Sequence, residues 1–440
     1  MPNICFYFQV HQPYRMRHYR VFDIGESTDY FDEKTNRDIC RKVADKCYLP
    51  ANALMLELIN KHNGAFKIAY SISGVALEQF AEYTPEVLES FKKLVATGHV
   101  ELLTETYYHS LAALFNPDEF REQVRLHQQA TQHYFGVTPQ IFRNTELIYS
   151  NGIADMVEDL GFKGMLTEGV DRILAWRSPN FVYEPHNGRG MKLLLKNYKL
   201  SDDIAFRFSQ QSWNGWPLTA EKFAKWVHET DGAADTINLF MDYETIGEHQ
   251  WEDTGIFDFF RSLPESIWQH PQFGFATPSE VITATPSMAK IDIPDSISWA
   301  DTERDLSAWL GNPMQDNAIA WVYKFEEGLK ALEDPALLHQ WRKLQTSDHF
   351  YYMCTKYWSD GDVHKYFSVY DSPHDSYVIM SNILTDLAIR IKQHPNHKPR
   401  TVKVEVESTA ATEEKASTKT TKEKATKKEP TKKRTTRVSK

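Results

Sequence analysis

Polar side chains follow four short apolar runs of this sequence. His11 follows the run 4–10, the segment 104–109 follows a second run, and Glu146 and Asp242 follow two others. In a parallel α/β barrel the carboxyl ends of the strands meet at one rim, where substrates bind. We therefore expect these carboxylates, imidazoles and aromatic rings to form one site that suits a polar, ring-shaped substrate.

Glu146 and Asp242 are the best-placed pair of carboxylates for cleaving a glycosidic bond. Such cleavage needs one carboxyl group that protonates the departing oxygen and a second that attacks the sugar, or activates water, from the opposite side. Each of the two residues follows a short apolar run at its polar end. The alternative interpretation is that either carboxylate only stabilises the dipole of a helix.

The sequence gives weaker support for a metal site or for a serine or cysteine nucleophile. His11, Asp242 and His249 are of the types that bind zinc, but the 17 histidines include no HExxH motif. No GxSxG motif marks a serine hydrolase, and none of the four cysteines lies in a recognisable nucleophile motif. We therefore predict no metal ion and no other cofactor.

Charge and composition favour a neutral partner. The net charge of −10 divides into +6 on residues 401–440 and −16 on the rest of the chain. An acidic body repels nucleic acid and anionic lipid but tolerates a carbohydrate. Aromatic residues make up 13% of the chain, and their rings either fill a core or stack on sugars. We expect no nucleic-acid or membrane partner, and the sequence does not indicate an oligomeric state.

The sequence also predicts the compartment. Its four cysteines show no CxxC spacing, which is typical of a reducing environment. The first residues lack the basic region of a signal peptide, and no apolar stretch of 18 residues follows. We therefore expect a cytoplasmic protein.

The elements that must position these side chains alternate along the first two-thirds of the chain. Strands are predicted at residues 4–10, 66–71, 100–104, 140–143, 164–167, 191–195 and 236–242. Helices are predicted between them at residues 48–63, 85–97, 116–135, 152–160, 219–229 and 254–268. This alternation indicates βαβ units and a parallel sheet. A barrel is preferred to a doubly wound sheet because no GxGxxG turn follows the first strand.

The last third has a different pattern. Helical periodicity dominates, with helices predicted at residues 318–333, 335–358 and 375–392 and a polar loop at 361–372. From about residue 394 the composition becomes rich in Lys, Thr and Glu, which cannot form a core. The predicted domains are a barrel at 1–285, a helical domain at 286–393 that contributes to the active site, and a disordered basic tail at 394–440 that is a linker or a docking segment.

Five ordered segments resemble the signature regions of glycoside hydrolase family 57. They are HQP at 11–13, GHVELL at 98–103, RNTELIYS at 143–150, MDYETIGEH at 241–249 and LQTSDHFYY at 344–352. The segments are most similar to the α-amylase-like branch of the family. One departure is Gln9, where some relatives have a further histidine.

The resemblance implies a distorted barrel of seven β/α units followed by a helical domain, and a retaining mechanism on α-glucans. It implies that Glu146 is the nucleophile and Asp242 the general acid/base. No metal is required. The residues it assigns to substrate binding are His11, Glu101, Asp348, Tyr351 and His249.

The two assigned roles require different protonation states and a defined separation of the carboxyl groups. Glu146 must be ionised while Asp242 holds a proton, so the pKa of Asp242 must be raised by burial or by a like charge such as Glu244 or Glu248. The two reacting carboxyl groups should lie about 5 to 5.5 Å apart. Asp348 should face the cleft, and the alternative is that it only pairs with Arg342 or Lys343 or caps a helix end.

We therefore predict a retaining α-amylase-type hydrolase of α-1,4-glucans or maltooligosaccharides. A 4-α-glucanotransferase remains an alternative, because hydrolysis and transfer differ only in whether water or a sugar hydroxyl accepts the glycosyl group. Branching activity is less favoured. A non-catalytic glucan-binding protein and a metal-dependent polysaccharide deacetylase are further alternatives, although no Asp/His/His triad for the latter can be assembled from the sequence.

Overall fold

Seven strands surround the centre of the molecule. The computed structural model describes residues 2–356 and 368–397. The seven strands are β1 (Asn3–Val10), β2 (Ile68–Ile72), β3 (Val100–Leu102), β4 (Ile141–Arg143), β5 (Gly164–Glu168), β7 (Lys192–Lys196) and β8 (Thr236–Asp242). They form two parallel sheets, one ordered β3-β2-β1-β8 and one containing β7-β5-β4.

The two sheets meet at both edges, which closes a distorted barrel. On one side Thr104, just after β3, bridges to Phe142 of β4. On the other side the backbone N–H of Asn197, just after β7, donates to the carbonyl of Asn238 in β8 at 2.9 Å. Each junction has few hydrogen bonds instead of a full ladder. This arrangement confirms the predicted barrel.

Three short strands extend these sheets. β9 (Gly274–Phe275) pairs with the start of β1, and β10 (Ala289–Ile291) pairs with β6 (Tyr183–Pro185), which lies antiparallel to β7. β10 carries the chain from the barrel towards the C-terminal helices.

Both faces of β1 are buried, as is usual for a strand in a parallel barrel. Cys5 and Tyr7 belong to a small apolar cluster with side chains from the other strands. Phe6 and Phe8 belong to the larger cluster formed with the surrounding helices. Gln9 is also buried, and its amide donates to Glu105 at 2.8 Å. The strand is therefore apolar until it approaches the rim.

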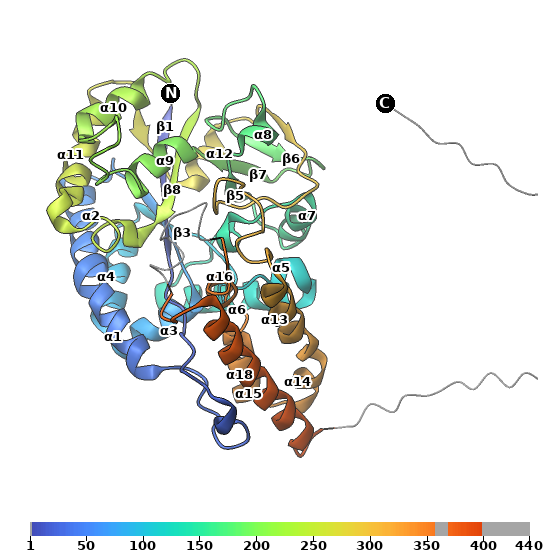
Figure 1. Cartoon of the computed structure of the whole chain (residues 1–440). Coiled ribbons are helices and arrows are strands. Elements are labelled where there is room, and N and C mark those ends of the chain that lie inside the picture. Colours follow the sequence, from blue (N-terminus) through green and yellow to red (C-terminus); the bar gives the residue numbers. More distant parts are fainter. Residues whose placement is uncertain (1, 357–367, 398–440) are drawn as a thin grey trace, which may run out of the picture. The chain divides into compact units, whose positions relative to one another are not determined.

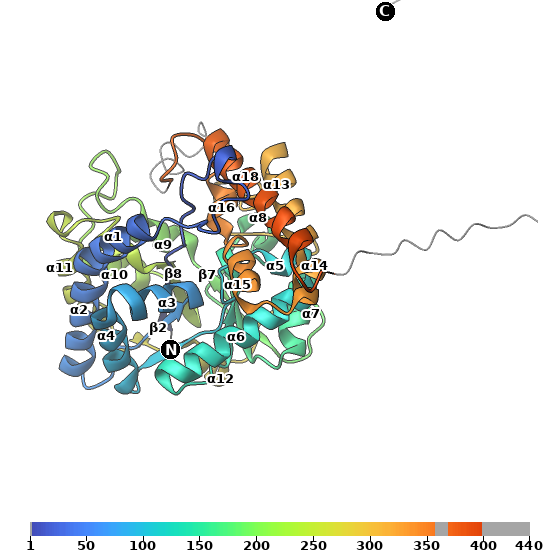
Figure 2. The same ribbon diagram turned by 90° about the horizontal axis from the view of Figure 1, so that it is seen from below.

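Helices cover the outside of the barrel (Figures 1 and 2). In Figure 2, α1 to α4, α10 and α11 lie on one side of the barrel, and α5 to α7 lie on the other. The bounds are α1 (Glu33–Val43), α2 (Leu49–Lys61), α3 (Gly74–Tyr83), α4 (Pro85–Ala96), α5 (Ala112–Phe115), α6 (Pro117–Phe135), α7 (Asn151–Asp159), α8 (Asp171–Leu174), α9 (Tyr198–Ala205), α10 (Ala220–His228), α11 (Ile256–Trp268) and α12 (Pro278–Ala284).

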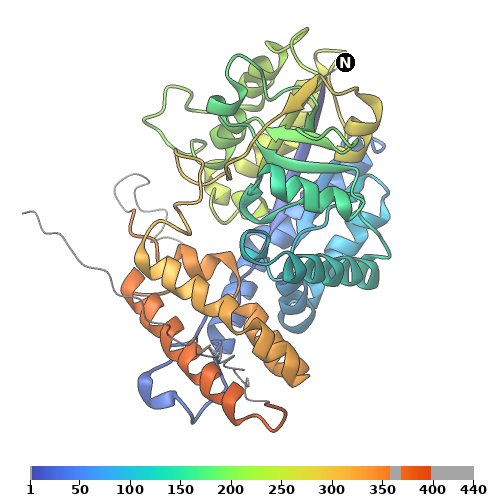
Figure 3. The ribbon, with the colours of Figure 1, turned by 90° about the vertical axis from the view of Figure 1, so that its right-hand side faces the viewer.

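The other helices of the described residues form the C-terminal region. In Figure 3 the orange and red helices lie side by side below the barrel, next to the blue segment that follows β1. Asp386 joins them to that segment, because it accepts hydrogen bonds from the Gly25 backbone and the Tyr30 hydroxyl, both at 2.6 Å. The helices are α13 (Pro313–Lys324), α14 (Glu326–Leu332), α15 (Pro335–Lys343), α16 (Ser347–Tyr351) and α18 (Pro373–Gln393).

The single helix predicted for 335–358 is wrong in its middle and at its end, since α16 ends at Tyr351 and residues 357 and 358 lie outside the described residues. α15 ends at Lys343, and Thr346 is not helical and bridges to Ser110 beside the barrel. The hydroxyl of Thr346 donates to the carbonyl of Tyr108 at 2.9 Å. These bonds to the barrel replace helical ones, so the interruption presents α16 to the rim.

The helix predicted for 318–333 is divided into α13 and α14 at Phe325.

Two other predictions fall largely outside the described residues. Most of the loop predicted at 361–372 and nearly all of the tail predicted at 394–440 lie outside the described residues. The domain boundary near residue 285 stays a prediction. In the described part of the chain, no helix is long and apolar enough to cross a membrane.

Candidate active site

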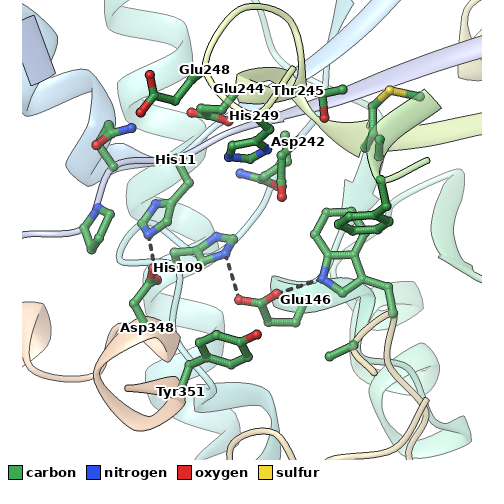
Figure 4. Close-up of a pocket in the computed structure, with 18 of the residues that line it drawn as sticks. His11, His109, Glu146, Asp242, Glu244, Thr245, Glu248, His249, Asp348 and Tyr351 are labelled. Atoms are coloured by element: carbon green, nitrogen blue, oxygen red, sulfur yellow. Dashed lines mark hydrogen bonds and ion pairs between the residues drawn. The ribbon is translucent and has the colours of Figure 1, made fainter. Parts of the chain in front are cut away.

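A cleft of about 570 Å³ opens at the carboxyl ends of the barrel strands. Six of the seven residues assigned to the site from the sequence line it (Figure 4): His11, Glu146, Asp242, His249, Asp348 and Tyr351. The first four come from the barrel and the last two from α16. Residues of the helical region therefore line this cleft together with residues of the barrel.

Glu146 lies in a tight turn that follows β4. The 3₁₀ turn η3 (Thr145–Leu147) places Glu146 at φ 57° and ψ 25°, in the left-handed region. Leu147 also has a positive φ, of 51°. Such conformations cost about 1 to 3 kcal/mol each in residues other than glycine. The amide of Asn144 stabilises the turn by donating to the carbonyl of Ile148 at 2.9 Å.

The carboxylate of Glu146 is surrounded by donors. The hydroxyl of Ser347 donates to Oε1 at 2.8 Å, and the indole N–H of Trp299 donates to Oε2 at 2.8 Å. Nε2 of His109 is 3.5 Å from Oε1. Burial alone would raise the pKa of Glu146, but the hydrogen bond and charge of His109 and the charge of Arg143 lower it below its usual value. Glu146 is therefore ionised at neutral pH.

His109 carries the positive charge in this arrangement. Its Nδ1 is 2.6 Å from a carboxylate oxygen of Glu105, and both residues are buried. Burial would lower the pKa of His109, yet the Glu105 carboxylate and Glu146 raise it to about 9. His109 is consequently an imidazolium that separates two carboxylates.

Asp242 is the last residue of β8 and has the opposite environment. It lies opposite Gln9 of β1 in the strand register. Burial, and then the negative charge of Glu146, raise the pKa of Asp242 to about 6, although Arg143, His109 and Lys196 act in the other direction. Asp242 thus retains its proton to a higher pH than an ordinary aspartate.

The negative charge that raises the pKa of Asp242 belongs to Glu146, whereas the sequence pointed to Glu244 or Glu248. Glu244 has its own pKa raised to about 8 by burial and by Asp242, so it is the neutral member of that pair. Glu248 lies 2.5 Å from the ammonium of Lys42 and 3.7 Å from that of Lys46. The expectation that Glu244 or Glu248 raises the pKa of Asp242 is therefore wrong, because one is protonated and the other is paired with lysines.

His11 and Asp348 connect the barrel to the helical region. Nε2 of His11 is 3.0 Å from a carboxylate oxygen of Asp348, and Nδ1 is 2.7 Å from the hydroxyl of Ser73. Burial and the charge of His109 lower the pKa of His11. Burial opposes ionisation of Asp348, but His11 and His109 hold its pKa well below the usual range. A neutral His11 therefore donates to an ionised Asp348.

The alternative in which Asp348 pairs with a neighbouring cation is wrong. Arg342 instead bonds to Glu119 at 2.7 Å, and the ammonium of Lys343 is 3.7 Å from Glu78. Both cations lie on α15, and their carboxylate partners are on α6 and α3. Asp348 is left to face the cleft.

Glu101 is the assigned residue that the structure does not bring to the cleft. It lies in the middle of β3, and its carboxylate accepts the backbone N–H of Ser279 at 2.8 Å in the first turn of α12. Glu101 is absent from the described residues that line the cleft. Its position contradicts a substrate contact, and the buried carboxylate of this segment that approaches the rim is Glu105, four residues later.

Tyr351 and His249 complete the assigned set. The ring of Tyr351 lies 6.3 Å from that of Trp309, centroid to centroid, at the side of the cleft built by the helical region. Burial and the charge of Lys42 lower the pKa of His249 to about 4. His249 is therefore neutral across the physiological range and adds no charge to the cleft.

Sequence reasoning missed several residues that contact Glu146 or, like Glu105, contact it through His109. His109 and Glu105 lie in the polar segment 104–109 that marked a strand end, and Ser347 adjoins Asp348, so their positions gave a signal. Trp299 gave none, because it belongs to no motif. Its ring packs against Arg143 and Lys196, whose cationic groups lie 4.7 and 5.3 Å from the ring centroid.

Metal ligands do not converge in the part of the chain that the structure describes. Within it, no group of three His, Cys, Asp or Glu side chains is arranged to hold an ion. The described residues therefore supply no ligand set for the deacetylase alternative.

Comparisons with known proteins agree with the geometry. The family described as Glycosyl hydrolase family 57 matches residues 5–294. A protein of Methanocaldococcus jannaschii named "Putative alpha-amylase" is 45% identical over 412 residues, which are 89% of this chain and 85% of that protein.

Two solved structures show the same fold. A GH57 branching enzyme of Thermococcus kodakaraensis matches with a TM-score of 0.63 and 14% identity, over 89% of this chain and 91% of that one. A 4-alpha-glucanotransferase of Thermococcus litoralis matches with a TM-score of 0.54 and 16% identity, over 80% of this chain and 50% of that one. The second match spans half of the longer enzyme.

Proposed function

The chain belongs to glycosyl hydrolase family 57, and we propose that it is a retaining enzyme that cleaves α-1,4-glucans by double displacement. The observation that carries this proposal is the pair of carboxyl groups in one cleft with opposite pKa shifts. The pKa of Glu146 is lowered, and that of Asp242 is raised to about 6. One group is prepared to attack and the other to donate a proton.

In the first step, a carboxylate oxygen of Glu146 attacks the anomeric carbon of the α-linked glucose. The bond from that carbon to the glycosidic oxygen breaks, and Asp242 transfers its proton to the departing oxygen. A β-linked glycosyl ester on Glu146 results, and Asp242 is left ionised. The negative charge of Glu146 is consumed at the same time, which removes the like charge that raised the pKa of Asp242.

In the second step, Asp242 acts as the base. It accepts a proton from water, whose oxygen attacks the anomeric carbon and releases Glu146 as a carboxylate. The product has the α configuration because the carbon has been inverted twice. A sugar hydroxyl in place of water would give transfer, and the same residues would serve both outcomes.

The surrounding donors control the nucleophile. Ser347 and Trp299 each donate to one oxygen of Glu146, so the carboxylate is held in one orientation. The imidazolium of His109 stabilises the ionised form before attack and the departing carboxylate in the second step. His11 and Asp348 lie on the other side of His109, where their polar atoms are available to sugar hydroxyls.

The choice of α-glucan rests on the relatives and on charge. The name of the M. jannaschii relative refers to an amylase. A neutral polysaccharide is compatible with the net charge of −10. The cytoplasmic location and the 5 to 5.5 Å carboxyl separation stay predictions.

Product analysis on maltooligosaccharides tests the proposal. The enzyme should release shorter α-glucans, and proton NMR at early times should show the α-anomer first. Release of the β-anomer first would contradict the retaining mechanism, and absence of cleavage on any α-1,4-glucan would contradict the substrate. Products longer than the substrate would identify transfer in place of hydrolysis.

A further inference from the structure

Two exposed aromatic residues belong to segments that help to build the cleft. Phe206 follows α9 and is 62% exposed, and Trp251 follows the segment 241–249 and is 55% exposed. Phe206 itself lines the cleft. A single exposed aromatic residue is ordinary on a protein surface, so exposure alone identifies no site.

The residues before the two rings are in direct contact. The side-chain amide of Gln250 donates to the backbone carbonyl of Ala205 at 2.9 Å, and both residues are buried. Phe206 and Trp251 are the next residues along each segment. This hydrogen bond brings two segments that are distant in sequence to the same edge.

The position of Trp251 is also fixed from a third element. The ammonium of Lys46 lies 5.0 Å from the centroid of its ring, a cation–π contact. Lys42, one turn earlier, lines the cleft and pairs with Glu248. The Trp251 ring is therefore in contact with the same helical stretch that supplies Lys42 to the cleft.

The chemistry of this edge suits glucose rings. The faces of a glucose unit carry C–H groups and its edges carry hydroxyls, so a flat aromatic ring buries apolar surface against a face and leaves the hydroxyls in water. A glucan chain whose scissile bond lies between Glu146 and Asp242 must leave the cleft on each side. Phe206 lies on the wall of that cleft, and so continues the binding surface already described.

We propose that Phe206 and Trp251 form an aromatic platform for glucose units of the substrate chain that are remote from the scissile bond. This inference rests on the proposed function and specifies it, because it makes this protein an enzyme that prefers long α-glucan chains. The platform acts through binding and takes no part in the bond-breaking steps.

The test compares a long and a short substrate. In the full-length protein, Phe206→Ala and Trp251→Ala should each lower kcat/KM on amylose about tenfold, which corresponds to ~1.4 kcal/mol. On 4-nitrophenyl α-maltoside, which is too short to reach beyond the cleft, Trp251→Ala should leave kcat/KM unchanged, and Phe206→Ala, whose ring lines the cleft, should lower it less than on amylose. Phe206→Tyr keeps a flat ring and should retain the wild-type value on amylose.

Matched controls exist elsewhere on the surface. Phe22 in η1 (Val21–Asp23) is 83% exposed and Trp176 is 84% exposed, and neither belongs to the described residues that line the cleft. Phe22→Ala and Trp176→Ala should leave kcat/KM on both substrates unchanged. Wild-type activity of the Phe206 and Trp251 variants on amylose, or an equal loss on both substrates, would overturn the platform.

A binding measurement separates this inference from the proposed function. Electrophoresis of the full-length protein through a gel that contains amylose reports binding without turnover. The wild-type protein should be retarded, and the Phe206→Ala/Trp251→Ala double variant should be retarded much less. If the wild-type protein binds amylose through these rings but cleaves no α-glucan, the proposed activity fails and the platform stands. Equal retardation of both proteins would overturn the platform.

Discussion

The ends of β4 and β8 supply one carboxyl group each, and the surroundings of the two groups are opposite. Beyond β4, Glu146 accepts hydrogen bonds from Ser347 and Trp299 and lies beside the imidazolium of His109. At the end of β8, burial and the charge of Glu146 dominate the environment of Asp242. One strand end stabilises a negative charge and the other opposes it.

This difference reverses the intrinsic order of the two acids. An isolated aspartate is a slightly stronger acid than a glutamate. In this cleft the pKa of Asp242 rises to about 6 while that of Glu146 falls. In the proposed mechanism, the roles of nucleophile and acid therefore follow from the groups around each carboxyl and not from the residue type.

The largest expected effect comes from removing either carboxyl group. Glu146→Gln eliminates the attacking oxygen, and Asp242→Asn eliminates the proton donor, so each variant should lose several orders of magnitude in kcat on maltooligosaccharides. Circular dichroism should show a wild-type fold in both. A folded variant with near-wild-type kcat would remove that residue from its role.

A pH profile tests the difference between the two carboxyl groups. Asp242 must be protonated for the first step, so kcat/KM of the wild-type enzyme should fall as the pH rises through about 6. Glu146 must be ionised, so the acid limb should lie below the usual pKa of a glutamate. An alkaline limb near pH 4, the value for an ordinary aspartate, would contradict the raised pKa.

Removing the charge of His109 should shift both limbs of the pH profile of kcat/KM. The imidazolium lowers the pKa values of Glu146 and Asp242, so in His109→Gln both carboxyl groups lose a stabilising positive charge and both pKa values rise. The acid and alkaline limbs of kcat/KM should move to higher pH together. His249→Gln is the control for the alkaline limb, because the pKa of His249 is lowered to about 4, so His249 is neutral near pH 6 and its removal should leave that limb in place. Limbs that stay fixed in His109→Gln would refute its electrostatic role.

Asp348→Ala should have a smaller effect, which is confined to catalysis. The change removes the acceptor that orients His11 across the cleft, and we expect kcat/KM to fall about 100-fold, as for a misplaced binding group. The melting temperature should change little, because Asp348 faces the cleft. Asp348→Asn keeps an acceptor and should retain more activity. Loss of stability with normal activity per folded molecule would make Asp348 structural.

The smallest effect on catalysis is expected at Glu101. Its carboxylate accepts the Ser279 backbone N–H at the start of α12, so Glu101→Ala should cost about 1 kcal/mol of unfolding free energy, as for the loss of a helix cap. Urea denaturation measures that loss, and kcat of the folded fraction should be unchanged. A large fall in kcat with unchanged stability would return Glu101 to the active site.

The barrel could be predicted because its strands are short apolar runs separated by helices. The break between α15 and α16 could not, because the local sequence there has helical periodicity. It arises from bonds between Thr346 and the barrel segment around Tyr108, and such long-range contacts leave no periodic trace in the sequence. The same break places Asp348 in the cleft.

The site was predicted where the side chain lies at or shortly after a strand end. His11 follows β1, Asp242 ends β8 and Glu146 comes three residues after β4, and all three line the cleft. Glu101 was assigned by resemblance to a segment, and it lies in the middle of its strand instead of at the rim. Trp299 comes from a loop with no motif, so only the folded chain reveals its hydrogen bond to Glu146.

The configuration of glycosyl azides tests most directly the claim that Glu146 attacks and Asp242 donates. Azide is a small nucleophile that can occupy the space left by a deleted carboxylate and needs no base. In Glu146→Ala, azide should attack the α-linked substrate in place of the missing carboxylate and form the β-glycosyl azide. In Asp242→Ala, with an activated substrate that needs no acid, it should attack the β-linked glycosyl ester on Glu146 and form the α-glycosyl azide. The reversed pair of anomers, or the same anomer from both variants, would contradict the assignment.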